Sequence, residues 1–221
     1  MLDQLYILPI LLFSVVVHEL AHGWMALRLG DTTARDMGRL TLNPIPHIDP
    51  VGSIFVPLFS LLVAGRVFIA WAKPVPVNPL NFSDYRRDDI LVSVVGPISN
   101  FLLAFVCTVI VILLAVITPL LHSSNSVLNE LMTFLLKMFA GGISLNVVLG
   151  VFNLIPIPPL DGSHIVASLL PEEAGERYRS IGFFGILVIL LLMRWPPFNM
   201  LFMEIIQMLT YPFQVLIHVF V

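Results

Sequence analysis

Residues 5–29 read LYILPILLFSVVVHELAHGWMALRL, an apolar run with three ionisable side chains close together inside it. A helix that crosses a bilayer needs about 20 mostly apolar residues, and this run is long enough. An ionisable side chain at membrane depth is costly unless it is paired or binds a metal. His18, Glu19 and His22 therefore predict a membrane helix that contains a functional site.

The rest of the chain is equally apolar. Of its 221 residues, 58% are hydrophobic and 11% are charged, against about 45–50% and about 25% in soluble globular domains. We therefore predict an all-α polytopic membrane protein with five or six membrane segments. Besides residues 5–29, the candidate segments are 51–70, 90–121, 131–157, 181–193 and 198–221.

The domain organisation and the partners follow from the same composition. We expect one membrane-embedded domain over residues 1–221, with a catalytic core at about 5–170 and C-terminal helices at about 178–221. The formal net charge is −3, and the chain has no basic block. A nucleic-acid partner is therefore not expected, whereas contact with the lipid bilayer is.

Proline-rich connections interrupt the apolar runs. In Pro74–Asn78, prolines alternate with valines. Proline lacks an N–H donor, so such a stretch suits an edge strand that is paired on one side only. We expect a small extended or β insertion near the cytoplasmic face, with Gly38–Leu42 as the neighbouring strand.

Basic residues indicate the topology. Lysine and arginine occur in the connections 28–39, 73–87 and 177–179, and are absent from 122–130. Basic connections stay in the cytoplasm, which predicts a multi-pass protein of the plasma (cytoplasmic) membrane with these three connections on one side. Because the run 51–70 lies between two of them, we expect it to re-enter the membrane on the same side.

The motif His18-Glu-Leu-Ala-His22 indicates the chemistry. Histidines four residues apart lie on one face of a helix and can bind the same metal ion. Zinc lowers the pKa of a bound water molecule to about 7, so Glu19 can take a proton from that water. A catalytic zinc site uses three protein ligands, and Asp161 is the candidate for the third. Prolines before it should break the helix and turn it inward, and Gly162 should allow close approach to the metal.

Three motifs together resemble the site-2 protease family of intramembrane zinc metalloproteases. They are HExxH at His18–His22, G-P-x-x-N at Gly96–Asn100, and N-x-x-P-x-P-x-L-D-G at Asn153–Gly162. The resemblance covers about residues 10–170. It implies an enzyme that hydrolyses a peptide bond in or near a transmembrane segment of single-span membrane-protein substrates.

The resemblance also implies roles for individual residues. His18, His22 and Asp161 would bind one Zn²⁺ per chain, and Glu19 would be the general base. Asn153 would hold the unwound substrate backbone, and Asn100 would do likewise or brace the site. Separately, His164 follows Asp161 by three residues, which makes it a candidate for a supporting or proton-relay role.

Alternative functions remain compatible with the sequence. The polar groups in the first run could be satisfied by a neighbouring helix, or bind a metal without catalysis. A membrane metal transporter would require ligands along several helices, whereas here they gather beside a glutamate. A catalytically silent relative that only binds membrane proteins would normally lack Glu19 or a ligand.

Overall fold

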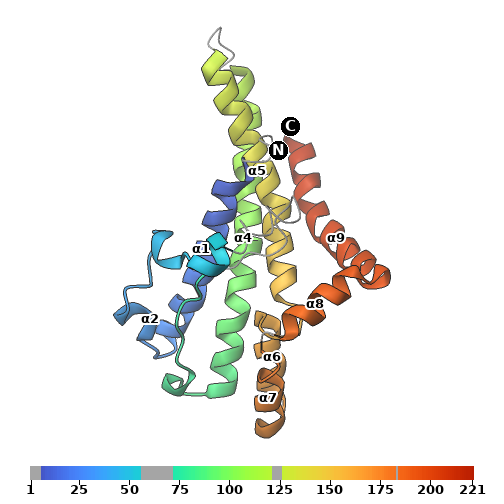
Figure 1. Ribbon diagram of the computed structural model, residues 1–221. Coiled ribbons are helices and arrows are strands. Elements are labelled where there is room, and N and C mark those ends of the chain that lie inside the picture. The colour runs from blue at the N-terminus through green and yellow to red at the C-terminus, as the bar shows by residue number, and fades with distance from the viewer. Residues whose placement is uncertain (1–5, 56–71, 121–125, 183) are drawn as a thin grey trace.

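The structure is a computed structural model that describes residues 6–55, 72–120, 126–182 and 184–221 (Figure 1). Within these ranges every regular element is a helix. The elements are α1 (Ile7–Arg28), α2 (Thr33–Asp36), η2 (Ile45–His47), η3 (Pro50–Phe55), η4 (Pro79–Asn81), α4 (Tyr85–Leu120), α5 (Ser126–Asn153), α6 (Asp161–Leu169), α7 (Glu172–Arg179), α8 (Phe184–Arg194) and α9 (Pro196–Phe220).

Four helices of the described chain are long and apolar enough to cross a membrane, namely α1, α4, α5 and α9. The prediction of an all-helical, multi-pass membrane protein is therefore confirmed. Helix α8 has 11 residues, or about 17 Å, which is too short to span a core of about 30 Å. The predicted re-entrant run 51–70 lies outside the described residues beyond Phe55.

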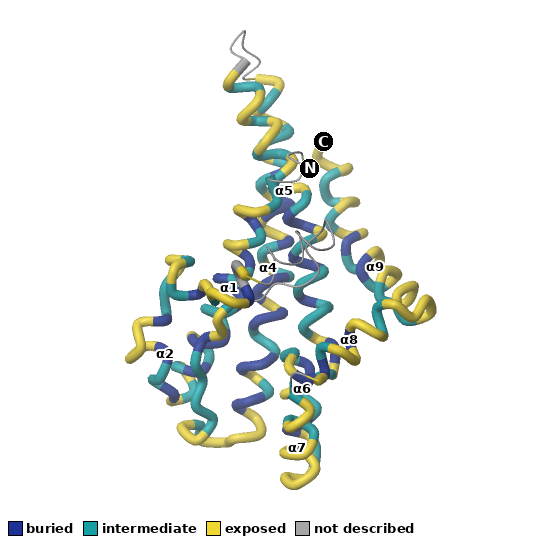
Figure 2. Tube along the Cα trace, in the orientation of Figure 1, coloured by how far each residue is buried: buried dark blue, intermediate teal, exposed yellow. Residues whose placement is uncertain are grey.

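Helices α1, α4 and α5 pack against one another, and α9 covers one side of α4 and α5. Their shared core holds small and branched apolar side chains: Ile10, Ala104, Cys107, Val111, Ile143, Val147 and Ile206. Figure 2 shows the buried residues where these helices meet, whereas outward-facing positions are exposed. Many exposed positions carry large apolar side chains such as Leu102, Phe105 and Leu113, which suits a surface that faces lipid.

The β form of the predicted extended or β insertion is wrong, because the described residues contain no strand. Pro74–Asn78 is not paired with Gly38–Leu42. Instead, the Val75 and Asn78 N–H groups donate to side chains of other segments, and the Arg39 guanidinium donates to two carbonyls, at 3.0 Å from Lys73 O and 3.3 Å from Pro74 O. Prolines leave the segment few donors for a ladder, and the Glu19 and Asp31 carboxylates accept two of those that remain.

The ends of the helices agree with the charge pattern. Helix α1 ends, and α4 begins, at the end of the bundle where α6 and α7 lie, while α4 ends and α5 begins at the opposite end (Figure 1). The two flanks of the run 51–70 lie against each other, since the Lys73 N–H donates to His47 O at 2.9 Å. The three basic connections thus share one end, and its cytoplasmic location stays a prediction.

Candidate metal centre

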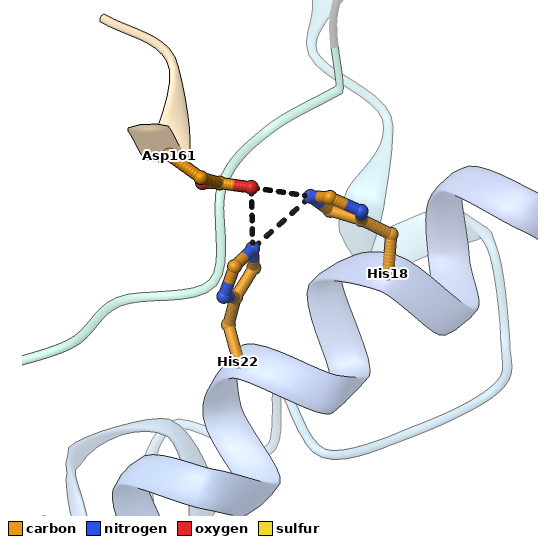
Figure 3. Close-up of side chains that lie close together, drawn as sticks. All are labelled: His18, His22 and Asp161. Atoms are coloured by element: carbon orange, nitrogen blue, oxygen red, sulfur yellow. Dashed lines mark hydrogen bonds and ion pairs between the residues drawn. The ribbon is translucent and has the colours of Figure 1, made fainter. Parts of the chain in front are cut away.

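Two helices bring three ligand atoms together. His18 and His22 lie one turn apart on α1, and their Nε2 atoms are 3.0 Å from each other. Asp161 Oδ2 lies 3.1 Å from His18 Nε2 and 3.4 Å from His22 Nε2 (Figure 3). Ligands about 2.0–2.1 Å from a tetrahedral zinc ion are about 3.3 Å apart. The three edges of this His-His-Asp cluster (His18, His22 and Asp161) therefore have the lengths that zinc requires.

Asp161 reaches the cluster because the chain breaks before it. Helix α5 ends at Asn153, and the proline-rich stretch 154–160 is not helical. Asp161 is the first residue of α6, after Leu160 in an extended conformation, as the prolines predict. Gly162 has a different use from the expected one: a Cβ there would collide with the Leu154 carbonyl, so this glycine allows α6 to pack on the end of α5.

Hydrogen bonds on the far side of each imidazole fix its tautomer. His22 Nδ1 lies 2.7 Å from Val92 O, a backbone carbonyl that can only accept, so Nδ1 carries the hydrogen. His18 Nδ1 lies 2.6 Å from Asn100 Oδ1 and donates in the same way. In neutral rings both Nε2 atoms then present lone pairs toward the Asp161 carboxylate. Three lone pairs facing one another repel unless a cation lies between them, so the donor set fits a metal ion.

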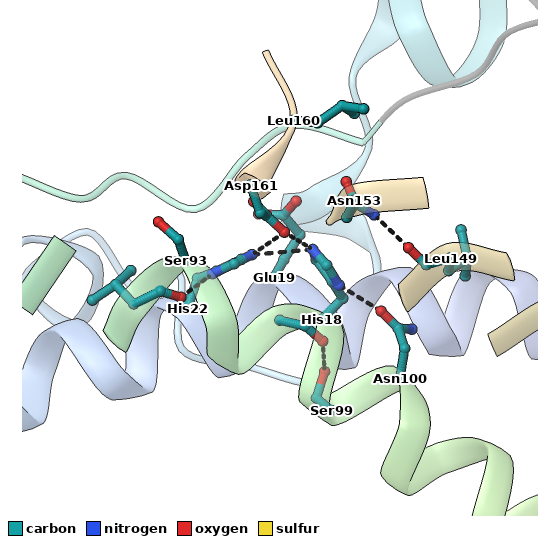
Figure 4. A network of polar contacts seen from close by, with 12 residues as sticks. His18, Glu19, His22, Ser93, Ser99, Asn100, Leu149, Asn153, Leu160 and Asp161 are labelled. Atoms are coloured by element: carbon teal, nitrogen blue, oxygen red, sulfur yellow. Dashed lines mark hydrogen bonds and ion pairs between the residues drawn. The ribbon is translucent and has the colours of Figure 1, made fainter. Parts of the chain in front are cut away.

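Gly96, the first residue of the G-P-x-x-N motif, gives the imidazoles their space. A Cβ at this position would lie 2.7 Å from His18 Cε1 and would also collide with His22 Nε2 (Figure 4 shows both rings beside α4). Both atoms belong to side chains that are held in place by other hydrogen bonds. Only glycine therefore allows α4 to pack this closely against the cluster.

We expect Gly96→Ala to weaken zinc binding at least about tenfold, because the methyl group would displace both rings from the ligand positions. The measurement is zinc affinity of the purified full chain by competition with a chelator. Gly141→Ala is the matched control, since its Cβ would meet Ile7 Cδ1, the end of a flexible side chain. Unchanged affinity in Gly96→Ala would contradict this account of the motif.

Glu19 is held beside the cluster by a segment distant in sequence. Its Oε2 accepts a hydrogen bond of 2.7 Å from the Val75 N–H. Figure 4 shows Glu19 next to the three ligand atoms, on the same helix as the two histidines. One carboxylate oxygen is thus oriented by the backbone, and the other makes no hydrogen bond within the described part of the chain. This arrangement suits a group that accepts a proton.

The segment that orients Glu19 is itself anchored by Asp31. Asp31 Oδ2 accepts from Asn78 N–H at 2.7 Å, and Oδ1 accepts from Asn81 Nδ2 at 2.7 Å and Thr33 Oγ1 at 2.5 Å. Burial raises the pKa of this carboxyl, but the hydrogen bonds outweigh burial and lower the pKa below its usual range. Asp31 therefore remains ionised and holds Val75–Asn78 in place near neutral pH.

A second polar network positions α6. Asp89, a buried residue of α4, accepts hydrogen bonds through Oδ2 from Ser168 Oγ at 2.6 Å and from Arg179 Nη2 at 3.0 Å. Ser168 lies at the far end of the helix that begins with Asp161, so the network fixes the direction of α6. His164 lies beside it, with Nδ1 3.7 Å from Asp89 Oδ1. Its supporting role at the metal stays a prediction, and the structure places it toward Asp89.

The two predicted asparagines lie in different environments. Asn100 is completely buried, and its Oδ1 lies 2.6 Å from His18 Nδ1; its bracing role stays a prediction. Asn153 is half-buried at the end of α5, where its Nδ2 donates to Leu149 O at 3.0 Å (Figure 4). Asn146, which was not among the predicted site residues, accepts a hydrogen bond from Asn100 at 3.0 Å. An amide within an apolar helix is itself the signal that could have revealed it.

Comparison with known proteins points to the same class of enzyme that the sequence motifs indicate, a zinc metalloprotease. The family model "Peptidase family M50" matches residues 6–193. The chain is 40% identical over 192 residues to "Putative zinc metalloprotease YwhC" of Bacillus subtilis (strain 168), which covers 86% of this chain and 81% of the relative. It is 29% identical over 195 residues to "Putative zinc metalloprotease Rip2" of Mycolicibacterium smegmatis, covering 88% of this chain and 69% of the relative.

A third relative, "Putative zinc metalloprotease Rip2" of Mycobacterium tuberculosis (strain H37Rv), is 30% identical over 201 residues, which are 90% of this chain and 70% of the relative. No solved structure matches the chain significantly. A membrane helix bundle with two buried histidines, a partly buried aspartate beside them and an adjacent glutamate is the arrangement of a membrane metalloprotease. The chain belongs to peptidase family M50, and the resemblance to the site-2 protease type is confirmed.

Proposed function

We propose that this chain is a single membrane-embedded domain that binds one zinc ion through His18, His22 and Asp161 and hydrolyses a peptide bond within or near a transmembrane segment. The observation that carries this proposal is the set of ligand distances of 3.0, 3.1 and 3.4 Å, with both Nε2 lone pairs directed inward. Among the described residues, these three are the group whose ligand atoms lie close enough together to hold a metal ion. A transporter would need further ligands along a path.

The depth of the site supports cleavage inside the membrane. His18 lies 11 residues from the start of α1 and 10 from its end, or about 15–17 Å from each. The half-thickness of a hydrocarbon core is about 15 Å. A peptide bond at this depth belongs to a membrane-spanning segment of the substrate, so the proposed substrates are single-span membrane proteins.

The proposed reaction is hydrolysis with Glu19 as general base and then general acid. Zinc would supply a water molecule of lowered pKa and would polarise the scissile carbonyl. Glu19 takes one proton from the water as its oxygen bonds to the carbonyl carbon. Glu19 then returns this proton to the leaving amide nitrogen as the C–N bond breaks. The Val75 N–H keeps the carboxylate oriented in both steps.

The substrate must be unwound before it is cut, because a helix hides its carbonyls in its own hydrogen bonds. We propose that Asn153 holds part of the unwound backbone, since its Nδ2 is used by Leu149 O while its Oδ1 accepts no hydrogen bond within the described residues. For Asn100 we propose the bracing role, because the whole side chain is buried. We also propose that the protein lies in the plasma membrane with its basic connections on the cytoplasmic side.

The test is co-expression with a panel of tagged single-span membrane proteins, followed by mapping of each cut by mass spectrometry. We expect cuts within the apolar span or within about one helical turn of it. A chelator should stop cleavage of purified substrate in detergent, and added zinc should restore it. The matched control is the soluble domain of each substrate without its span, which should stay intact. Cuts confined to soluble regions would contradict the proposal.

A further inference from the structure

A chain of hydrogen bonds runs from His18 across three helices to a backbone carbonyl. His18 Nδ1 on α1 is 2.6 Å from Asn100 Oδ1 on α4. Asn100 Nδ2 donates to Asn146 Oδ1 on α5 at 3.0 Å. Asn146 Nδ2 donates to Gly142 O, one turn earlier on α5, at 2.9 Å. Both asparagines are fully buried, so water cannot replace these partners.

The donor and acceptor of each hydrogen bond in this network are set by the Gly142 carbonyl, where the network ends. Gly142 O is a carbonyl and can only accept, so Asn146 must turn its NH₂ group toward it. Asn146 Oδ1 then faces Asn100 and can only accept, which turns the Asn100 NH₂ group away from α1. Asn100 therefore presents its oxygen to His18. The ring must donate through Nδ1, and its Nε2 keeps the lone pair that a metal requires.

We propose that Asn146 is a positioning residue that fixes the tautomer of His18 through Asn100, although it does not touch the metal cluster. Without it, the Asn100 amide could flip and donate to His18 Nδ1. The neutral ring would then carry its hydrogen on Nε2, directed at the metal position, and could not bind. His22 has no such dependence, because a backbone carbonyl, which cannot flip, fixes its ring directly.

This inference rests on the proposed zinc site, but its main readout does not need zinc or proteolysis. The experiment is NMR of the zinc-free full chain labelled with ¹⁵N-histidine, with His18 identified by the signal that His18→Asn removes. We expect the Nδ1–H form in the wild type and a clear Nε2–H population in Asn146→Leu. Zinc affinity in Asn146→Leu should fall at least about tenfold, as for other residues that support a ligand.

A double-mutant cycle separates positioning from general stability. In an Asn100→Leu background, Asn146→Leu should weaken zinc binding by less than about twofold, because both residues act through one path. Thr108→Val is the matched control: its hydroxyl is fully buried on α4 and donates to Ala104 O, away from this path. It should change neither the tautomer nor the zinc affinity.

Three outcomes would overturn the inference. They are an unchanged His18 tautomer in Asn146→Leu, unchanged zinc affinity in that variant, and additive losses in the double variant. If the wild-type chain bound no zinc at all, the proposed function would fail instead. The ¹⁵N signals of the metal-free chain would still show whether Asn146 determines the tautomer of the His18 ring.

Discussion

Replacing Glu19 by glutamine is expected to abolish cleavage while leaving zinc in place. Glutamine keeps the shape of the side chain, and its Oε1 can still accept the Val75 N–H. It cannot take a proton from water, so we expect the rate to fall at least about a hundredfold, the usual range for loss of a general base. The measurement is the rate of cleavage of a purified single-span substrate, with zinc content determined on the same sample.

The matched control for this variant is Glu204→Gln, which removes an exposed carboxylate of α9 away from the cluster. It should cleave at the wild-type rate. Metal transport, the rival function, does not require a proton acceptor at position 19 and should survive Glu19→Gln. Cleavage by Glu19→Gln within about twofold of the wild type would show that the carboxylate has another role.

Asp161→Asn is expected to remove zinc from the protein. The amide is a poor metal ligand, and its NH₂ group can donate to the Nε2 atoms that Oδ2 now faces. Loss of one of three ligands should weaken zinc binding at least about a hundredfold, more than loss of a supporting residue. Because a bound ligand stabilises the folded state, the rise in melting temperature that zinc gives the wild type should disappear.

The measurements for Asp161→Asn are elemental analysis and melting temperature with and without a chelator. Asp36→Asn, at an exposed position of α2, is the control and should retain zinc. The metal-free variant should melt no lower than the metal-free wild type, because its amide relieves the repulsion of three lone pairs. Equal zinc content in Asp161→Asn and wild type would remove Asp161 from the ligand set.

Much of the site could be predicted because residues close together in the sequence specify it. Histidines four residues apart must share a helix face, so His18 and His22 point the same way whatever surrounds them. The prolines before Asp161 must end a helix, and α5 does end at Asn153. The predicted spans 5–29 and 198–221 match α1 and α9 within two residues, whereas α4 and α5 each begin five residues before the predicted spans 90–121 and 131–157.

Other parts could not be predicted because partners distant in sequence decide them. Pro74–Asn78 has the alternation of an edge strand, but its Val75 and Asn78 N–H groups donate to the Glu19 and Asp31 carboxylates. Gly162 follows the ligand Asp161 and suggests contact with a metal, but it packs on the Leu154 carbonyl. In each case the local pattern allows two structures, and contacts made only in the folded chain select one.

By itself, the sequence determined that this protein crosses a membrane and that it carries a paired-histidine site with an adjacent glutamate, because composition and helical spacing act over a few turns. Only the tertiary structure decided that Asp161 meets the histidines, that Gly96 leaves them room, and that Asn146 orders the amide behind His18. These relations join residues 46 to 143 positions apart in the chain. Packing brings them together, and no local rule specifies it.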